Sequence, residues 1–316
     1  MNYQEFAGAV EKKMNYKMEG GMRANLYRTL RNNGTERLGI MMETEGRNMS
    51  PTIYLEEFYM RYQKGETLDD IVKDIERFCQ EARAQMPEGV GMLERFERVH
   101  DKIVFKLINT GQNQELLRDV PNMPFLDLSI VFYVLLGINS KGTATMLVRN
   151  EHLKLWDVKV EDMIRAAEQN VTRLLPAELT TMRRTMDELL CPSECGGRRN
   201  LLYCGTNGLK SGREGEEDFM YVLSNQLRSF GAACIVYPHV LEMVGNIVGE
   251  DFSVLPSSVH EVIIVPESYS LEQKEMDEMV TEINETQVAD EEVLSNHAYF
   301  YEREAKKLIL QKYVSC

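Results

Sequence analysis

The stretch LPSSVHEVIIVPE, residues 255–267, holds the residue types of a nucleophilic relay within a few positions. Ser258, His260 and Glu261 offer a hydroxyl nucleophile, a general base and a carboxylate, which hydrolases and transferases use together. The apolar run that follows predicts a strand, in which alternate residues share a face. Ser258 and His260 would then point one way and Glu261 the other. We therefore favour a structural interpretation, in which the serine and the histidine bond to nearby groups.

Three cysteines lie close together in CPSECGGRRNLLYC. Cys191, Cys195 and Cys204 would supply soft ligands for zinc, with His239 or His260 as a fourth. Their spacing differs from the paired C-x-x-C pattern of common structural zinc sites, and no second pair follows. Free loop thiols are the alternative interpretation. We expect no cofactor, and metal binding by these cysteines stays an open hypothesis.

Two other segments are weaker candidates for chemistry. GTNGLKSG, residues 205–212, is superficially similar to a phosphate-binding loop, but Leu209 separates Gly208 from Lys210 where that loop needs a lysine directly after the glycine. The carboxylates of ADEEV, residues 289–293, are interpreted as a solvated charge run, because nothing in the sequence places them in an apolar pocket.

Hydrophobic periodicity predicts the elements that must position these residues. Alternation on both sides of Asn32-Asn33-Gly34 indicates a β-hairpin. Thr67 is a suitable cap for an amphipathic helix that follows it. The remaining expectations for the first part of the chain are strands at 51–58 (leading into a helix), 102–109, 125–138 and 143–150, and helices at 3–18, 112–118, 159–175 and 177–190.

The second part of the chain shows a similar mixture. For residues 219–267 we predict two strands, then a helix, then two more strands, because apolar runs alternate with turn residues there. The second of these strands is GAACIVYP, residues 231–238. Ser270 and Gln273 predict a capping box for the next helix, and a strand or turn and a terminal helix are expected after His297.

This order of elements predicts an α+β fold with a mixed or mostly antiparallel sheet, built from hairpins with packed amphipathic helices. Residues 191–218 hold many glycines and no sustained periodicity, so we interpret them as a mobile loop or insertion. The loop divides the chain into an N-terminal α+β region, 1–190, and a C-terminal α+β region, 219–316. We expect the second region to complete the same fold as the first.

Composition excludes several functional classes. The formal charge of −14 repels nucleic acids and anionic lipid surfaces, so neither is an expected partner. The most apolar stretch, residues 125–138, is shorter than the roughly 20 residues that span a membrane, and Asp127 interrupts it. The first residues lack the apolar core of a signal peptide. Together with the scattered cysteines, these features predict a soluble cytoplasmic protein with reduced thiols.

Several segments resemble an uncharacterised family from gut clostridia, the domain of unknown function numbered 5688. They are GINSKGTATMLVRNEHLKLWDVKVEDMIRAAEQN, MYVLSN, GAACIVYPHVLEMVGNIVGEDFSVLPSSVHEVIIVPE and VLSNHAYFYERE. The similarity covers the chain from about Asn25 to Glu304, and its most specific block lies between Met220 and Glu267. The resemblance implies a bacterial, intracellular, soluble protein, and it brings no activity, ligand or catalytic residue with it.

These observations leave three hypotheses of function. The first is a non-enzymatic binding or regulatory protein with an unidentified protein or small-molecule partner, since core patterning is dense and no coherent chemical motif is present. The second is a hydrolase or transferase with a site near Ser258 and His260. The third is a module stabilised by a metal bound to cysteines.

Overall fold

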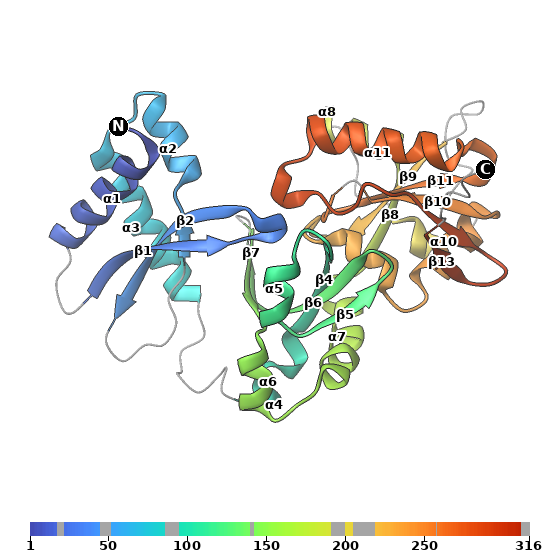
Figure 1. Cartoon of the computed structure of the whole chain (residues 1–316), viewed down its shortest axis with the longest axis horizontal. Coiled ribbons are helices and arrows are strands. Elements are labelled where there is room, and N and C mark those ends of the chain that lie inside the picture. Colours follow the sequence, from blue (N-terminus) through green and yellow to red (C-terminus); the bar gives the residue numbers. More distant parts are fainter. Residues whose placement is uncertain are drawn as a thin grey trace.

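A computed structural model shows an N-terminal unit and a larger body that meet at the tip of one β-hairpin (Figure 1). Every strand pair described is antiparallel, and helices pack on the sheets, so the predicted α+β fold is confirmed. The residues that the structure describes are 1–17, 22–44, 52–85, 95–139, 142–190, 200–204, 219–256 and 258–310.

The N-terminal unit is a three-stranded sheet, in the order β1-β2-β3, that packs against helices. Its hydrophobic core is formed by residues 6–79 alone, and it includes Phe6, Ile40 and Ile75, whose side chains are fully buried. The elements are α1 (Tyr3–Lys17), β1 (Met22–Leu30), η1 (Asn32–Gly34), β2 (Glu36–Thr44), β3 (Thr52–Tyr54), α2 (Glu56–Gln63) and α3 (Leu68–Gln85).

The predicted turn and cap of this unit are both confirmed. Asn33 and Gly34 adopt positive φ values of 59° and 70°, the conformation that Asn-Gly favours between hairpin strands. The Thr67 hydroxyl accepts the backbone N–H of Asp70 at 3.3 Å and so caps α3. The hairpin extends beyond the unit toward the body (Figure 1).

The first sheet of the body is four-stranded, with the order β4-β6-β5 and with β7 along β6. One face of β4 carries Phe105 and Leu107 into the main core, where α7 packs, and the other carries Ile108 into a small cluster with Val120. The elements are α4 (Phe96–Val99), η2 (His100–Lys102), β4 (Ile103–Asn109), α5 (Gln114–Asp119), β5 (Asn122–Phe125), β6 (Leu128–Asn139), β7 (Gly142–Leu147), α6 (Asn150–Trp156) and α7 (Val160–Leu174).

The second sheet of the body is six-stranded, in the order β13-β12-β10-β11-β9-β8. Met276 and Val280 of α11 form a hydrophobic cluster with Val265, a residue of the sheet, and so cover one of its faces. The other face belongs to the main core. The elements are β8 (Ala177–Thr181), α8 (Met182–Leu190), α9 (Leu201–Cys204), β9 (Tyr221–Asn225), η4 (Gly231–Val236), α10 (Val240–Val248), β10 (Phe252–Leu255), β11 (Val262–Pro266), η5 (Glu267–Tyr269), α11 (Gln273–Gln287), η6 (Asp290–Glu292), β12 (Tyr299–Glu302) and β13 (Lys307–Ile309).

The main core contains residues from 99 to 301. Residues between 219 and 301 therefore share this core with residues between 99 and 201. The hydrophobic cores group residues 6–79 separately. Of the loop at 191–218, the structure describes only residues 200–204, so its predicted mobility lies outside the described residues.

The strand predicted at 231–238 is wrong, because Gly231–Val236 is the 3-10 helix η4. Ala232, Ala233, Cys234 and Ile235 are all buried, so this short apolar run has no alternation that would distinguish a strand from a buried helix. Phe230 directly before it has a φ of 56°, which turns the chain out of the extended conformation.

Three further boundaries differ from expectation. The helix predicted at 177–190 begins only at Met182, because 177–181 is strand β8, whose β-branched residues Thr180 and Thr181 favour a strand. The last element within the described residues is strand β13 at Lys307–Ile309, where a terminal helix was expected. Ser270 does not cap α11: its hydroxyl donates to the backbone oxygen of Pro266 at 3.2 Å, and Glu272 precedes the helix instead.

Replacing Gly231 with Ala will test the close packing of η4 against β9. A Cβ at this position would lie 2.1 Å from Ser224 Oγ, 2.5 Å from His260 O and 2.6 Å from Asn225 N. Two of these atoms belong to the backbone and cannot rotate away, so we expect a loss of about 3 kcal/mol in the free energy of unfolding by urea. The matched control is Gly8→Ala in α1, where a Cβ meets nothing within 4 Å and helix propensity predicts a gain of up to about 1 kcal/mol. Equal stability of the two variants would contradict this packing.

Candidate functional site

Lys106 is the most unusual charged residue of the described structure. It lies in the middle of β4 and pairs with Val131 of β6. Only 9% of its surface is exposed, whereas lysine is almost never buried without a partner. Among the described residues, its ammonium nevertheless has no hydrogen bond and no ion pair, so its environment needs a different explanation.

Aromatic rings surround the Lys106 ammonium. Its Nζ lies 4.7 Å from the centre of the Tyr133 ring and 4.6 Å from the centre of the Phe230 ring. These two rings are stacked, with their centres 6.0 Å apart. Aromatic faces attract cations, most strongly where water is excluded. The rings thus replace part of the hydration that the amine has lost, but they provide no counter-charge.

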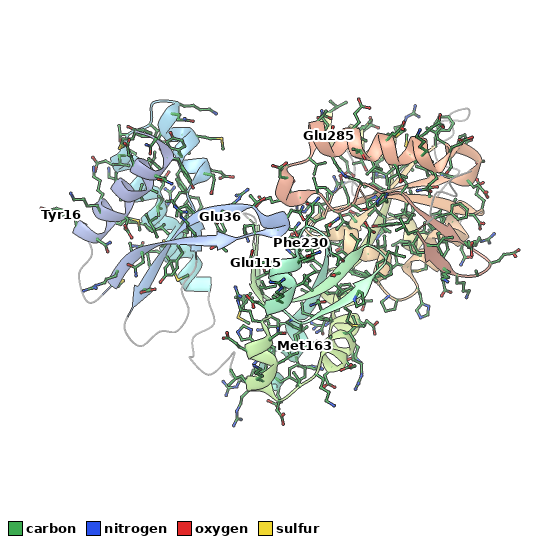
Figure 2. The ribbon with its side chains drawn as sticks, viewed as in Figure 1. Tyr16, Glu36, Glu115, Met163, Phe230 and Glu285 are labelled. Carbon is green, nitrogen blue, oxygen red and sulfur yellow. The ribbon has the colours of Figure 1, made fainter. Side chains whose placement is uncertain are left out.

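Lys106 and the two rings also line a cavity of about 10 Å³, room for about one water molecule. Most of the lining is apolar, and Thr145 and Ser229 contribute hydroxyl-bearing side chains. Figure 2 places Phe230 in the central region of the molecule, where the hairpin labelled at Glu36 approaches the body.

The electrostatic environment of Lys106 favours its neutral form. Burial lowers the pKa of Lys106 to about 7, and the positive charge of Arg31 acts in the same direction, while Glu291 opposes it. Burial also raises the pKa of Tyr133, and Arg31 and Tyr54 act on it with opposite signs. Residues of the N-terminal hairpin and its sheet therefore belong to the same electrostatic site.

Arg31 is the second cation of this site. Its guanidinium carbon lies 4.2 Å from the centre of the Tyr54 ring, and within the described part of the chain no carboxylate pairs with it. Arg37 of the neighbouring strand differs, because it forms an ion pair with Glu291 of η6. The site thus contains unpaired positive charge on each side of the contact between the N-terminal unit and the body.

Polar contacts hold the hairpin tip against the body. The Asn33 side-chain amide donates to the backbone oxygens of Asp290 and Val293, each at 2.7 Å. The Asn113 side chain accepts the Asn33 backbone N–H and donates to its side-chain oxygen, each at 2.8 Å. Asn32 donates to the backbone oxygen of Glu291 at 2.8 Å. We call this region, formed by η1, η6 and Asn113, the joint.

The interpretation of the acidic run at 290–292 as solvated holds for Asp290, which is exposed, but not for Glu291, whose side chain is mostly buried. Glu291 pairs with Arg37, and Glu292 Oε1 lies 3.3 Å from His260 Nε2. The sequence alone did not show these partners, because both belong to distant parts of the chain.

His260 packs behind Phe230 and not against a nucleophile. Its ring stacks on the Phe230 ring with centres 5.8 Å apart, and its Nδ1 accepts the Phe230 backbone N–H at 3.3 Å. The Ser258 hydroxyl accepts the backbone N–H of His260 at 3.1 Å. Both ring nitrogens thus have partners other than Ser258. The structural interpretation of the two residues stays a prediction, which the variants described below test.

The other candidates from the sequence are not assembled into a site in the described structure. The expected strand begins only at Val262, so the prediction that Ser258, His260 and Glu261 alternate along it was wrong. Glu261 is half-buried and lies directly before β11. Cys191 and Cys195 lie outside the described residues, as does the side chain of Cys204 at the end of α9. No group of His, Cys, Asp or Glu side chains able to hold a metal ion occurs in the ranges that are described. The segment 205–212 is not described either.

A second hollow, of about 350 Å³, lies between η4, α10 and the β12-β13 hairpin. Its lining includes Tyr237, Leu241 and Tyr301, and Lys306 at its edge is paired with Glu242 at 2.8 Å. Lys307 also lines this hollow, but both of its lysines are exposed to solvent, whereas Lys106 is buried. An anion would therefore gain less from the two exposed lysines.

Another polar cluster, beside α11, is internally satisfied. Asp127 accepts the Ser295 and Tyr299 hydroxyls at 2.7 and 2.6 Å. Asp277 accepts the backbone N–H of Ala298 at 2.8 Å and lies 2.9 Å from His297 Nδ1. These contacts fix the chain before β12, and we assign them a structural role.

The sequence contained a signal for Lys106 that the strand prediction did not use. KIVFKLIN places one lysine after three apolar residues and before two others. A strand that is apolar on both faces is buried on both faces, so its only internal charge must be buried as well. The convergence of Arg31 could not be predicted in the same way, because it depends on how the hairpin docks.

Comparisons with known proteins assign the chain to a family but to no activity. A family model described as a family of unknown function, DUF5688, matches residues 3–303, and the resemblance noted from the sequence is therefore confirmed. Neither the curated proteins nor the solved structures gave a match. Among the helices of the described residues, none is long and apolar enough to cross a membrane.

Replacing Lys106 with Met will test the burial of the amine. The folded-state pKa of about 7 is below the ordinary 10.5, so between these pH values the unfolded chain binds a proton that the folded chain has lost. The free energy of unfolding of the wild type should therefore rise with pH relative to that of Lys106→Met, by up to about 1.4 kcal/mol per pH unit. Below pH 7 the difference in free energy of unfolding between the two proteins should be constant, and Lys106→Met should be the more stable. Urea unfolding of both proteins from pH 6 to 10 measures it, with Lys154→Met on the exposed face of α6 as control. If the difference in free energy of unfolding between wild type and Lys106→Met were independent of pH, the Lys106 amine would not be buried as described.

Replacing His260 with Gln will test whether the ring is structural. Loss of stacking on Phe230 and of the bond to its N–H should lower the free energy of unfolding by about 1–3 kcal/mol, and Ser258→Ala should lower it by about 1 kcal/mol. Thermal melting of both variants measures the effect. If both melted like the parent, a catalytic role for these residues would become the better explanation.

Proposed function

We propose that this protein, which belongs to the family of unknown function DUF5688, is a non-enzymatic binding protein that takes up a small organic carboxylate between its N-terminal unit and its body. One observation carries the proposal: the Lys106 ammonium is buried between the Tyr133 and Phe230 rings without a carboxylate partner in the described structure. Arg31, which also lacks such a partner there, acts on it as a second positive charge. Exposed cations without an ion pair also occur in the described structure, for example Lys154, but Lys106 is buried.

The chemistry of the lining supports an organic carboxylate over inorganic phosphate. Val104, Leu135 and Leu175 line the cavity beside Lys106 and would contact a short apolar tail. A doubly charged phosphate would need more donors than these residues offer, because burying an anion without hydrogen bonds is unfavourable. A monocarboxylate requires neutralisation of one charge only, which the ammonium or the guanidinium supplies.

Binding at this place would also regulate the contact between the two units. The cavity has room for about one water molecule, so a carboxylate enters only when the surrounding side chains move apart. Arg31 directly precedes η1, whose asparagines hold the hairpin to the body. A ligand bridging Arg31 and Lys106 would therefore change the stability of the joint. A ligand can shift such an equilibrium only by its differential affinity for the two arrangements.

The proposal retains the cytoplasmic location and the small-molecule partner expected from composition, with nucleic acid and membrane surfaces excluded by charge. The hydrolase or transferase alternative has no comparable support, because the partners of His260 are Phe230 and Glu292. A cysteine-bound metal stays a hypothesis about residues that the structure does not describe.

Titration with lactate, followed by calorimetry and by the melting temperature, tests the proposal. We expect saturable stabilisation by millimolar lactate and none by equal concentrations of phosphate or chloride. Lys106→Met should weaken binding at least tenfold, because a charge-assisted hydrogen bond contributes about 1.5–3 kcal/mol. Arg31→Gln should weaken it to a similar extent, and Lys154→Met should leave it unchanged. Absence of binding by the wild type, or equal binding by Lys106→Met, would overturn the proposal.

A further inference from the structure

We infer that the Lys106 amine is a nucleophile that captures the carbonyl carbon of a small oxo acid as a reversible imine. This inference rests on the proposed function, because it assigns the carboxylate of the same ligand to Arg31 and its carbonyl group to Lys106. It makes the site a covalent trap that is selective for oxo acids over the corresponding hydroxy acids.

The geometry leaves the amine available for such a reaction. Lys106 lines the cavity together with Tyr133 and Phe230, whose ring centres lie 4.7 and 4.6 Å from Nζ. Within the described structure no hydrogen bond or ion pair occupies the lone pair or the protons of this nitrogen. β4 is buried along most of its length and pairs with β6 throughout, so the backbone that carries the lysine is rigid. A nucleophilic lysine needs this combination of a fixed position and an apolar, desolvated environment.

The protonation state supports the geometry. Because burial and Arg31 lower the pKa of Lys106 to about 7, a substantial fraction of the amine is neutral at neutral pH and carries a free lone pair. An exposed lysine with an ordinary pKa of about 10.4 is almost entirely protonated there. Arg31 from the hairpin, Glu291 from η6 and Tyr133 from β6 are the titratable or charged groups that act on or contact it.

The reaction requires no oxidant, reductant or metal. The nitrogen lone pair forms a C–N bond to the carbonyl carbon while the oxygen takes up a proton, and the nitrogen loses one, giving a carbinolamine. Loss of the hydroxyl with a proton, as water, then leaves the C=N bond of the imine. Protonation of the imine gives an iminium cation, and the Tyr133 and Phe230 rings would stabilise that charge as they stabilise the ammonium.

The same rings argue against the other small electrophile that buried amines capture, carbon dioxide. Its product, a carbamate, would place negative charge close to two aromatic faces, which are themselves negative. An iminium keeps the site cationic, and the ligand's own carboxylate supplies the counter-charge. An oxo acid is therefore the ligand class that satisfies both the cations and the rings.

Pyruvate and lactate form a matched pair for the test, because they differ only at the carbon that reacts. The full-length protein would be incubated at pH 7.5 with each acid and with cyanoborohydride, which reduces an imine to a stable secondary amine, and the modified lysines would be located by peptide mass spectrometry. We expect pyruvate to add once, at Lys106, at least tenfold faster than at any other lysine. Lactate should give no adduct and should protect Lys106 from pyruvate.

Variants separate charge from nucleophilicity. Lys106→Arg keeps the positive charge but has no nucleophilic amine, so pyruvate and cyanoborohydride should not modify position 106 in this variant. If this variant does not fold, the wild-type rate from pH 6 to 9 replaces it: the rate of labelling at Lys106 should reach half its maximum near pH 7, whereas labelling of exposed lysines should still be rising at pH 9.

The outcomes distinguish the two proposals. Protection of Lys106 by lactate together with selective trapping of pyruvate supports both. The imine proposal is overturned if lactate and pyruvate bind equally and pyruvate gives no adduct, or gives adducts spread evenly over the lysines. The proposal of carboxylate binding would survive that result. Failure of both acids to bind while trapping is also absent overturns both.

Discussion

The buried ammonium of Lys106 is the constraint on which the centre of this molecule depends. β4 is covered on both faces, by the main core on one and by the aromatic rings on the other. A charge in such a strand loses most of its hydration, and the structure compensates with ring faces and a lowered pKa instead of a carboxylate. Replacing the lysine by an apolar residue would relieve this penalty, so stability alone does not explain its presence.

The contact between the two units is of a different kind from the packing inside them. Each unit has its own hydrophobic core, whereas the joint is made of asparagine side chains, backbone oxygens and one ion pair. Polar contacts of this sort exchange readily with water and contribute little net free energy each. The hairpin can therefore leave the body without exposing a core, and a ligand needs only a modest differential affinity to influence that equilibrium.

Most elements of the fold could be predicted from short stretches of the sequence. The Asn33-Gly34 turn, the Thr67 cap and the helix at 160–174 were predictable because each depends on a few neighbouring residues. Residues 177–181 and 231–236 were assigned wrongly because both are buried irrespective of face, which removes the periodicity. The site was less predictable than the fold, since Arg31, Lys106, Phe230 and Glu291 meet only after the hairpin docks.

The residues that first suggested chemistry do contribute to the site, but through packing. Ser258 accepts the His260 backbone N–H, the His260 ring supports Phe230, and Phe230 covers the Lys106 amine. The Glu292 carboxylate contacts Nε2 of the same imidazole. Glu292 belongs to η6, and Asp290 of η6 accepts a hydrogen bond from the Asn33 side chain of the hairpin. His260 is therefore a positioning residue between the joint and the aromatic rings. A change in docking at η6 would therefore act on Lys106 through Glu292, His260 and Phe230, because each of these groups contacts the next.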